Sequence, residues 1–486
     1  MKQYRVTFLP AGTTVTVEEG ATLLQAEIQA GLKPYAPCGG KGTCGKCKVT
    51  AQAGTEVLAC QTIVDGDMTV TVRQDTSERI LTDGLDVATV PDGKNAYALA
   101  FDIGTTTVVA YLMDGITGAE LARASCMNPQ GQYGADVISR IQHVLDNGGE
   151  TMSGCIRTAL AALTREVSRK AGIRPEEITV AAVVGNTAMH HLLLEIDPRP
   201  LIIPPYMPNV SQALTVEPAG LLPISGSVRV LPNIAGFVGG DTVGCMVATR
   251  FDKRKELTLL IDIGTNGEMV LGDAHRRIAC STAAGPAFEG AKISCGMRGA
   301  EGAVDHVQLE EGNITYHVIG EKKPIGLCGS GLLDLVASLL DAGIIDESGH
   351  LEGGEYRLCE NVTLTQKDVR EVQLAKAAIR AEIELMSARL GRKIEEIQKV
   401  LLAGAFGNYL NPRSACRIGM IPPELLPKIQ PIGNAAGEGS RLCALNEAEY
   451  AYASVLATHT EFLELASLPE FQDCYVDCLT FEEEEE

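Results

Sequence analysis

The stretch from Cys38 to Cys60 reads CGGKGTCGKCKVTAQAGTEVLAC, and its four cysteines, at 38, 44, 47 and 60, are separated by five, two and twelve residues. Four glycines lie among the first three cysteines. Because glycine tolerates positive φ, this loop can curl tightly enough for the thiolates of Cys38, Cys44 and Cys47 to converge. Cys60 would complete the set from the strand that follows. We therefore expect these four thiolates to bind an iron–sulfur cluster.

The spacing of the cysteines favours one kind of cluster. It is close to the C-x4-C-x2-C…C pattern of plant-type ferredoxins, with five residues in place of four in the first gap. Zinc favours C-x2-C pairs, and only Cys44 and Cys47 have that spacing, so zinc is the less favoured alternative. A disulfide framework is less favoured still, because the chain shows no secretion signal. The spacing predicts a [2Fe–2S] cluster.

Composition indicates a multidomain α/β protein. The chain has 486 residues, the length of about three domains. Its 51 glycines and 45% hydrophobic residues fit an α/β fold with many tight turns. The net charge of −21 disfavours nucleic acid and anionic membranes as partners. No apolar run approaches the roughly 18 residues of a membrane span. We expect a cytoplasmic protein that binds neither nucleic acid nor membrane.

Residues 1–76 predict a small α+β domain around the cysteine loop. Strands are expected at 4–9, 13–17, 48–51, 56–59 and 68–72, and a helix at 21–30, before Gly31. This order resembles that of the β-grasp ferredoxins. Residues 77–96, which are mostly polar, are expected to form a linker.

Two similar segments, 160 residues apart, follow the linker. They read YALAFDIGTTTVVAYLMD from Tyr97 and LTLLIDIGTNGEMVLGD from Leu257. In each, an apolar strand ends at an aspartate, Asp102 or Asp262, and a glycine turn leads into a second strand. Such turns suit phosphate binding, because backbone amides and threonine hydroxyls can face an anion while the aspartate holds Mg²⁺ through its waters.

A second pair of segments supports an internal duplication. Glu-Glu-Ile occurs at 176–178 and again at 395–397, and in both places an apolar strand follows and ends at a glycine, Gly185 or Gly404. We expect two βββαβα halves, at 97–235 and 236–486, the second with about 59 extra residues that include an inserted hairpin at 300–324.

These segments resemble the superfamily of actin, Hsp70 chaperones and sugar kinases, in which two RNase H-like halves clamp ATP. The resemblance implies phosphate loops at 102–107 and 262–268 and an adenosine motif in LLAGAFGNYL (401–410). The implied nucleotide-binding residues are Asp102, Gly104, Thr105, Thr106, Thr107, Gly264, Thr265, Asn266, Glu268, Gly404 and Gly407.

The same resemblance implies three catalytic residues. The segment AGFVGGDTVGCMVA (235–248) is similar to the sugar-kinase stretch that supplies the catalytic aspartate, so Asp241 is the candidate that orients or activates the attacking water. In the simpler alternative, Asp241 only caps a helix at 242–250. Asp262 would support magnesium-dependent hydrolysis, and Glu289 would assist it.

A [2Fe–2S] β-grasp domain followed by an actin-like ATPase resembles the reductive activators of corrinoid proteins. The stretches 183–198, 281–305 and 324–346 fit that family as well. The resemblance implies ATP-dependent reduction of an inactive Co(II) corrinoid to Co(I), with the electron passing from an upstream low-potential donor through the cluster. This sequence has no D-x-H-x-x-G cobalamin motif, so the corrinoid would belong to a partner protein of a methyltransferase system.

Two other functions stay open. The ATPase part could phosphorylate a small molecule under redox control, or the chain could be a non-catalytic electron carrier that nucleotide switches. Larger members of the family carry a longer linker and an extra domain, to which dimerisation is attributed. Here the linker is about twenty residues, so a homodimer is left open.

Overall fold

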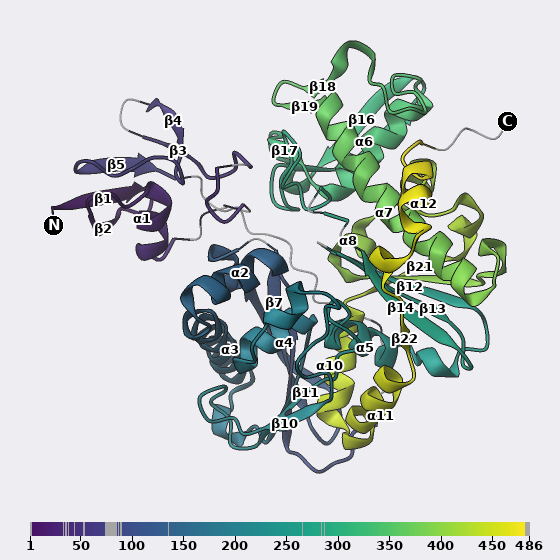
Figure 1. Cartoon of the computed structure of the whole chain (residues 1–486). Coiled ribbons are helices and arrows are strands. Elements are labelled where there is room, and N and C mark those ends of the chain that lie inside the picture. Colours follow the sequence, from purple (N-terminus) through teal and green to yellow (C-terminus); the bar gives the residue numbers. More distant parts are fainter. Residues whose placement is uncertain are drawn as a thin grey trace. The chain divides into compact units, whose positions relative to one another are not determined.

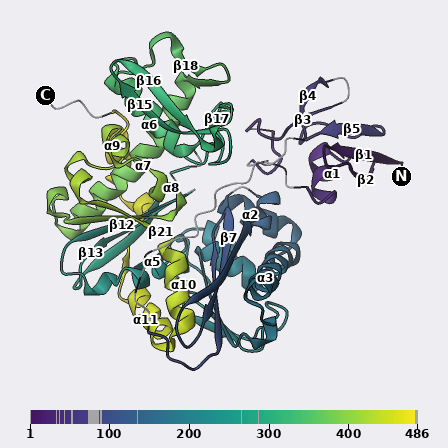
Figure 2. The ribbon, with the colours of Figure 1, turned by 180° about the vertical axis from the view of Figure 1, so that it is seen from behind.

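The computed structural model describes residues 2–72, 85, 87 and 90–481, apart from 33, 35, 37, 43, 52, 53, 135, 265, 283 and 286. The chain, drawn from two sides in Figures 1 and 2, forms two compact units. The small unit comprises residues 1–78 and 129–148, and the large unit comprises residues 79–128 and 149–486. Most of the predicted linker lies outside the described residues, and the domain boundaries stay predictions.

The small unit contains a five-stranded mixed sheet and a helix that packs against it. These elements are β1 (Gln3–Leu9), β2 (Thr13–Glu18), α1 (Leu23–Gln29), β3 (Lys48–Thr50), β4 (Glu56–Leu58) and β5 (Met68–Thr71). The strand order is β2-β1-β5-β3-β4, with β1 antiparallel to β2 and parallel to β5. Val6, Phe8 and Val70 of the sheet are buried together with Leu23 and Ala26 of α1. The structure confirms the predicted β-grasp fold.

A segment from later in the chain also belongs to the small unit. Residues 129–148 contain the 3₁₀ helix η2 (Pro129–Gln132) and the helix α2 (Val137–Asn147). Asp136 caps α2, because its Oδ1 accepts a hydrogen bond from the Ser139 amide at 2.7 Å. The sequence did not predict that this segment would join the cysteine domain.

The large unit contains two six-stranded sheets. The first comprises β6 (Tyr97–Ile103), β7 (Thr107–Asp114), β8 (Glu120–Met127), β9 (Val180–Gly185), β10 (Leu214–Val216) and β11 (Ser227–Val230), in the order β10-β11-β9-β6-β7-β8. The second comprises β12 (Thr258–Ile263), β13 (Gly267–Gly272), β14 (Arg277–Thr282), β20 (Lys399–Ala403), β21 (Ile429–Gly433) and β22 (Glu461–Phe462), in the order β21-β20-β12-β13-β14-β22. Three antiparallel strands and two parallel ones recur in both sheets, as the duplication predicts.

The duplication extends to the strand register. Asp102 lies opposite Val184 in the parallel pair β6/β9, and Asp262 lies opposite Ala403 in the parallel pair β12/β20. The next residues along β9 and β20 are the glycines that the sequence had matched. Both aspartates therefore stand at the carboxyl ends of parallel strands, where open α/β sheets bind ligands.

Helices and an insertion complete the large unit. The helices are α3 (Glu150–Ala171), α4 (Thr187–Leu194), α5 (Gly240–Ala248), α6 (Gly329–Asp341), α7 (Gln366–Leu390), α8 (Gly404–Tyr409), α9 (Pro412–Arg417), α10 (Ala435–Leu445), α11 (Glu447–Thr458) and α12 (Phe471–Asp477). The predicted hairpin at 300–324 is confirmed as β15 (Ala303–Glu310) and β16 (Asn313–Val318), to which β17 (Gly326–Leu327) adds a third strand. A second hairpin, β18 (Glu355–Cys359) and β19 (Val362–Thr365), was not predicted. None of the helices in the described part of the chain combines the length and the apolar character that crossing a bilayer requires.

The helices α5 and α10 touch through their backbones. A Cβ on Gly439 would lie only 2.1 Å from the Gly244 carbonyl oxygen, and a Cβ on Gly244 would lie 2.9 Å from the Ala436 carbonyl oxygen. From α10, the Ser440 hydroxyl also donates to the carbonyl oxygens of Phe101 (3.0 Å) and Ala182 (3.1 Å) in the first sheet. A helix that follows β21 of the second sheet in sequence is thus bonded to the first sheet.

Replacing Gly439 by alanine should destabilise the large unit by about 1–3 kcal/mol, as overpacking of a core does. The new methyl group would meet a helix backbone, which cannot rotate away as a side chain can. Differential scanning calorimetry measures the effect. Gly154→Ala in α3 is the matched control, because that glycine is exposed and a Cβ there would meet no atom within 4 Å. The control should gain roughly 0.5–1 kcal/mol, and equal losses in both variants would contradict the backbone contact.

Candidate functional site

The cysteine loop has the backbone conformation that the sequence predicted. The φ angles of Gly39, Gly40, Gly42 and Gly45 are 62°, 83°, 75° and 65°. All four lie in the left-handed region, which a side chain makes costly. At Gly42, a Cβ would in addition lie 2.7 Å from the Gln61 side-chain nitrogen. Glycine is therefore required for the loop to curl.

The four cysteines form two pairs. The sulfur atoms of Cys38 and Cys44 lie 3.3 Å apart. Cys47 is paired with Cys60, and both are buried, with exposures of 4% and 7%. Burial, followed by the interaction with Cys60, raises the pKa of Cys47 to about 12.

This pairing matches the needs of a two-iron cluster, in which each iron takes two thiolates. Backbone amides also reach the sulfur atoms, those of Lys46 and Cys38 at Cys44 and that of Cys60 at Cys47. When bound, a [2Fe–2S] cluster supplies one-electron chemistry, and these amides would tune its potential.

Replacing Cys44 by serine should remove the visible absorption of the [2Fe–2S] cluster, because one iron would lose a thiolate. Absorption spectroscopy and iron analysis of the purified full chain measure the loss. The control is Cys359→Ser, which changes a partly buried cysteine in β18 of the large unit and should leave the cluster intact. A normal [2Fe–2S] spectrum in the Cys44 variant would overturn the ligand assignment.

In the large unit, four carboxyl groups interact electrostatically. Asp102 and Asp262 end β6 and β12, Asp241 is in the first turn of α5, and Glu268 faces Asp262 across β12 and β13. Burial is the main cause that raises the pKa values of Asp102 and Asp241 to about 6 and that of Asp262 to about 7. Burial, and then the neighbouring carboxylates Asp241 and Asp262, also raise the pKa of Glu268. A site that crowds four acids favours a cation.

The predicted phosphate loops are tight turns. The Gly104 amide donates to the Thr107 carbonyl and the Gly264 amide to the Asn266 carbonyl, both at 2.8 Å. The amides of the two glycines thus close their own turns, so anion binding would fall to other donors of the loops. Thr265 lies outside the described residues.

Two asparagines that the sequence did not single out hold the first loop. Asn186 donates from Nδ2 to the Thr105 hydroxyl at 3.0 Å. Asn128 donates from its side-chain Nδ2 to the Gly104 carbonyl oxygen and from its backbone amide to the Thr106 carbonyl oxygen, both at 2.8 Å. Asn186 also caps α4, which is a signal that the sequence offers.

A third asparagine connects the two sheets at the candidate site. Asn434 Nδ2 donates to Asp102 Oδ2 at 2.8 Å and to the Tyr111 hydroxyl at 3.2 Å. Its Oδ1 accepts from the Gly437 amide at 2.8 Å and so caps α10. Asp102 in the first sheet is therefore oriented by the residue that directly follows β21 of the second sheet.

The remaining predicted residues are placed as follows. Asp241 is in the first turn of α5 and not at its N-cap, which is Gly239, but its Oδ1 accepts a hydrogen bond from the Thr242 amide at 2.7 Å and so satisfies one free amide at the start of the helix. Gly404 lies against Asp262, since a Cβ there would be 2.3 Å from Asp262 Oδ1. Gly407 packs α8 onto Leu402 of β20. Glu289 is partly exposed and follows Phe288, whose ring stacks on Phe406 of α8 at 5.0 Å. The roles of all these residues stay predictions.

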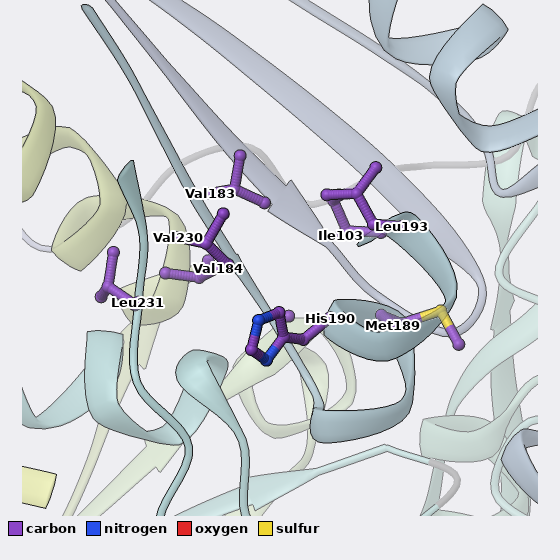
Figure 3. A pocket seen from close by; sticks show the side chains of 9 residues that line it. Ile103, Val183, Val184, Met189, His190, Leu193, Val230 and Leu231 are labelled. Atoms are coloured by element: carbon purple, nitrogen blue, oxygen red, sulfur yellow. The ribbon is translucent and has the colours of Figure 1, made fainter. Parts of the chain in front are cut away.

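The cavity in Figure 3 is not a second candidate site. It lies between β6, β9, β11 and α4, and its lining is apolar apart from His190. Its volume of about 10 Å³ is that of roughly one water molecule. Burial and the neighbouring His191 lower the pKa of His190 to about 3, so this imidazole is neutral. Both histidines are core residues.

The fold and the paired cysteines define a class of protein, a [2Fe–2S] domain joined to an ATPase domain of the actin, Hsp70 and sugar-kinase type. Comparison with family models agrees. Residues 6–70 match the 2Fe-2S iron-sulfur cluster binding domain, residues 97–254 match the RACo middle region, and residues 256–486 match the C-terminal ASKHA domain of RACo. Nucleotide binding follows from the ASKHA domain.

Relatives identify the family. The corrinoid activation enzyme RamQ of Eubacterium limosum is 37% identical over 79% of this chain and 70% of its own length. The [Co(II) methylated amine-specific corrinoid protein] reductase of Methanosarcina barkeri is 28% identical over 70% of this chain and 68% of its own. A solved reductive activator for a corrinoid, iron-sulfur protein matches 98% of both chains at 30% identity, with a TM-score of 0.73. This chain belongs to the family of reductive activators of corrinoid proteins.

Replacing Asn434 by alanine should slow ATP hydrolysis about tenfold or more, because hydrogen bonds to charged groups contribute about 1.5–3 kcal/mol. Steady-state phosphate release measures the rate. Asn446→Ala is the matched control, since Asn446 also caps a helix, α11, through the Ala448 amide at 2.8 Å. Both variants should lose the cap, about 1 kcal/mol, and the Asn434 variant should lose further stability with its bonds to Asp102 and Tyr111, but the control should keep its activity. Equal activities would show that the bond to Asp102 is catalytically irrelevant.

Proposed function

We propose that this protein uses ATP to reduce an inactive Co(II) corrinoid, held by a partner protein of a methyltransferase system, to Co(I). The observation that carries the proposal is the presence, in one chain, of a paired-cysteine loop and an acid-lined ATPase site, at 37% identity to a corrinoid activation enzyme. The electron enters from a low-potential donor and leaves through the [2Fe–2S] site. Fifteen cysteines, which a reducing compartment keeps as thiols, support a cytoplasmic location.

The chemical need for ATP follows from the potentials. Plant-type clusters lie near about −400 mV, and Co(II) in a corrinoid is harder to reduce than such a donor alone can manage. ATP can shift this equilibrium only if the nucleotide binds one arrangement of the protein more tightly than another. The two sheets are joined through α5, α10 and Asn434. Their arrangement is therefore the one that nucleotide binding would favour or disfavour.

The carboxyl groups would have different roles in ATP hydrolysis. Asp102 and Asp262 stand at the ends of their strands, where they would hold Mg²⁺ through its water ligands. Asp241 would accept a proton from the attacking water while the bond from the γ-phosphorus to its bridging oxygen breaks. Burial that raises its pKa to about 6 makes it a better base than an exposed aspartate.

In the test, a partner corrinoid protein in the Co(II) state is mixed with the reduced full chain, and Co(I) formation is followed by absorption. Reduction should require ATP and magnesium. Asp262→Ala should abolish both hydrolysis and reduction but keep the cluster spectrum. Asp273→Ala is the control, because Asp273 only accepts hydrogen bonds from the His275 and Arg276 amides in an exposed turn. Reduction at the same rate without ATP would refute the proposal.

A further inference from the structure

Residues 129–148 leave the ATPase part of the chain and return to it. They follow β8, which ends at Met127, and precede α3, which begins at Glu150. Both of these elements belong to the large unit, yet the segment between them belongs to the small unit. We call residues 129–148 the coupling segment.

The coupling segment contacts the cluster loop. A Cβ built on Gly39 would lie 3.8 Å from Gly134 Cα and 4.0 Å from the Tyr133 carbonyl oxygen. These are ordinary van der Waals distances for an added methyl group, so the backbone of the segment lies beside Gly39 with about the width of a methyl group between them. The residue before Gly39 is the cluster ligand Cys38. A displacement of the segment at Tyr133 and Gly134 would therefore act on a residue adjacent to a ligand.

The first end of the segment is tied to the phosphate loop. The residue just before it, Asn128, makes the two hydrogen bonds to the Gly104 and Thr106 carbonyl oxygens, both at 2.8 Å. Only five residues separate Asn128 from Gly134. The covalent chain thus runs directly from a loop predicted to bind phosphate to a contact beside the cluster.

The segment has the internal contacts of a stiff element. The Tyr133 amide donates to the Gln130 carbonyl at 3.0 Å. Arg140, which is 1% exposed, donates from Nε to the Gly134 carbonyl at 2.8 Å. The rings of Tyr133 and His143 lie 4.8 Å apart. These contacts fix Gly134 to α2. A displacement of Asn128 would therefore displace Gly134, and with it the backbone beside Gly39.

We propose that the coupling segment transmits nucleotide occupancy from the first phosphate loop to the cluster loop. The inference rests on the ATPase site of the proposed function and adds the element that connects this site to the cluster. A nucleotide that repositions the Gly104 and Thr106 carbonyl groups moves Asn128, and the segment moves Gly39 with it. The conformation beside Cys38 then depends on the nucleotide, which is the differential interaction that coupling between two sites requires.

The first test needs no variant. Hydrogen exchange of the reduced full chain is measured with and without the non-hydrolysable ATP analogue ADPNP. Exchange at residues 39–47 and 130–134 should change together, by about fivefold or more, the lower range of measured couplings. If ADPNP protects the phosphate loops while residues 39–47 exchange as before, the proposal is wrong.

The second test compares two alanine variants of the same segment. In Gly134→Ala, the Cβ would lie 2.5 Å from the Ser139 hydroxyl and 2.7 Å from the Arg140 amide, so the contact with Gly39 must shift. In Gly131→Ala, the nearest atom is 3.8 Å away, in the Arg140 side chain, and the methyl group fits. The first variant should lose the nucleotide dependence of exchange at residues 39–47, and the second should keep it.

Activity separates this proposal from the proposed function. Gly134→Ala should hydrolyse ATP within about twofold of the unchanged protein and show a normal cluster spectrum, yet its ATP-dependent Co(II) reduction should fall about fivefold or more. Full ATP-dependent reduction in Gly134→Ala would overturn the role of the segment and leave the proposed function standing. An unchanged protein that reduces Co(II) equally well without ATP would instead refute the proposed function, and it would remove the signal that the segment is proposed to transmit.

Discussion

The geometry of the ATPase site depends on the backbone contact between α5 and α10. Because Gly244 and Gly439 carry no side chains, the two helices can approach until carbonyl groups and Cα atoms touch. Asp241 lies in the first turn of α5, and Asn434 caps α10, so the contact fixes where both residues stand. Any side chain at the crossing would separate Asp241 from the loop that carries Asp102. The small residues in AGFVGGDTVGCMVA and GNAAGEGS are therefore as important for the site as the acids themselves.

The site is electrostatically incomplete as a purely protein structure. Asp102, Asp241, Asp262 and Glu268 all have pKa values raised mainly by burial. Neighbouring carboxylates contribute next, Asp241 and Asp102 at Asp262, and Asp241 and Asp262 at Glu268. No basic side chain is among the interactions that set these pKa values, and each of the four residues is partly exposed, so a positive charge from outside would favour the ionised forms. A magnesium–nucleotide complex would supply it and displace protons on binding. The side-chain amide of Asn434 donates a hydrogen bond to Asp102 and so offsets part of the free-energy cost of ionising that partly buried carboxyl group.

Local patterns predicted most of the fold and part of the site. Alternating apolar residues, the two Asp-Ile-Gly-Thr turns and the repeated Glu-Glu-Ile segments were enough to place the strands of the small unit and β6–β9, β12–β14 and β20 of the large unit, because period and spacing are properties of sequence alone. The bonds of Asn128 and Asn434 could not be found in this way. Asn434 is 332 residues from Asp102, and an isolated asparagine carries no sign of the distant group that its amide will meet. The predicted start of the helix at residue 242 was two residues late, since α5 begins at Gly240 and Asp241 bonds the Thr242 amide from within the first turn.

The attachment of the small unit is the feature that sequence reading described least well. The polar stretch at residues 77–96 predicted a single connection, a short linker, between the cluster domain and the rest of the chain. Because residues 129–148 also belong to the small unit, the chain passes between the units at three places, near residues 78, 128 and 148. Two of these passages flank a stiff segment held by Arg140 and by the cap of α2. If the coupling segment acts as proposed, the ATPase part acts on the cluster loop through the covalent chain from Asn128 to Gly134, and delivery of the electron then depends on this segment as well as on the linker.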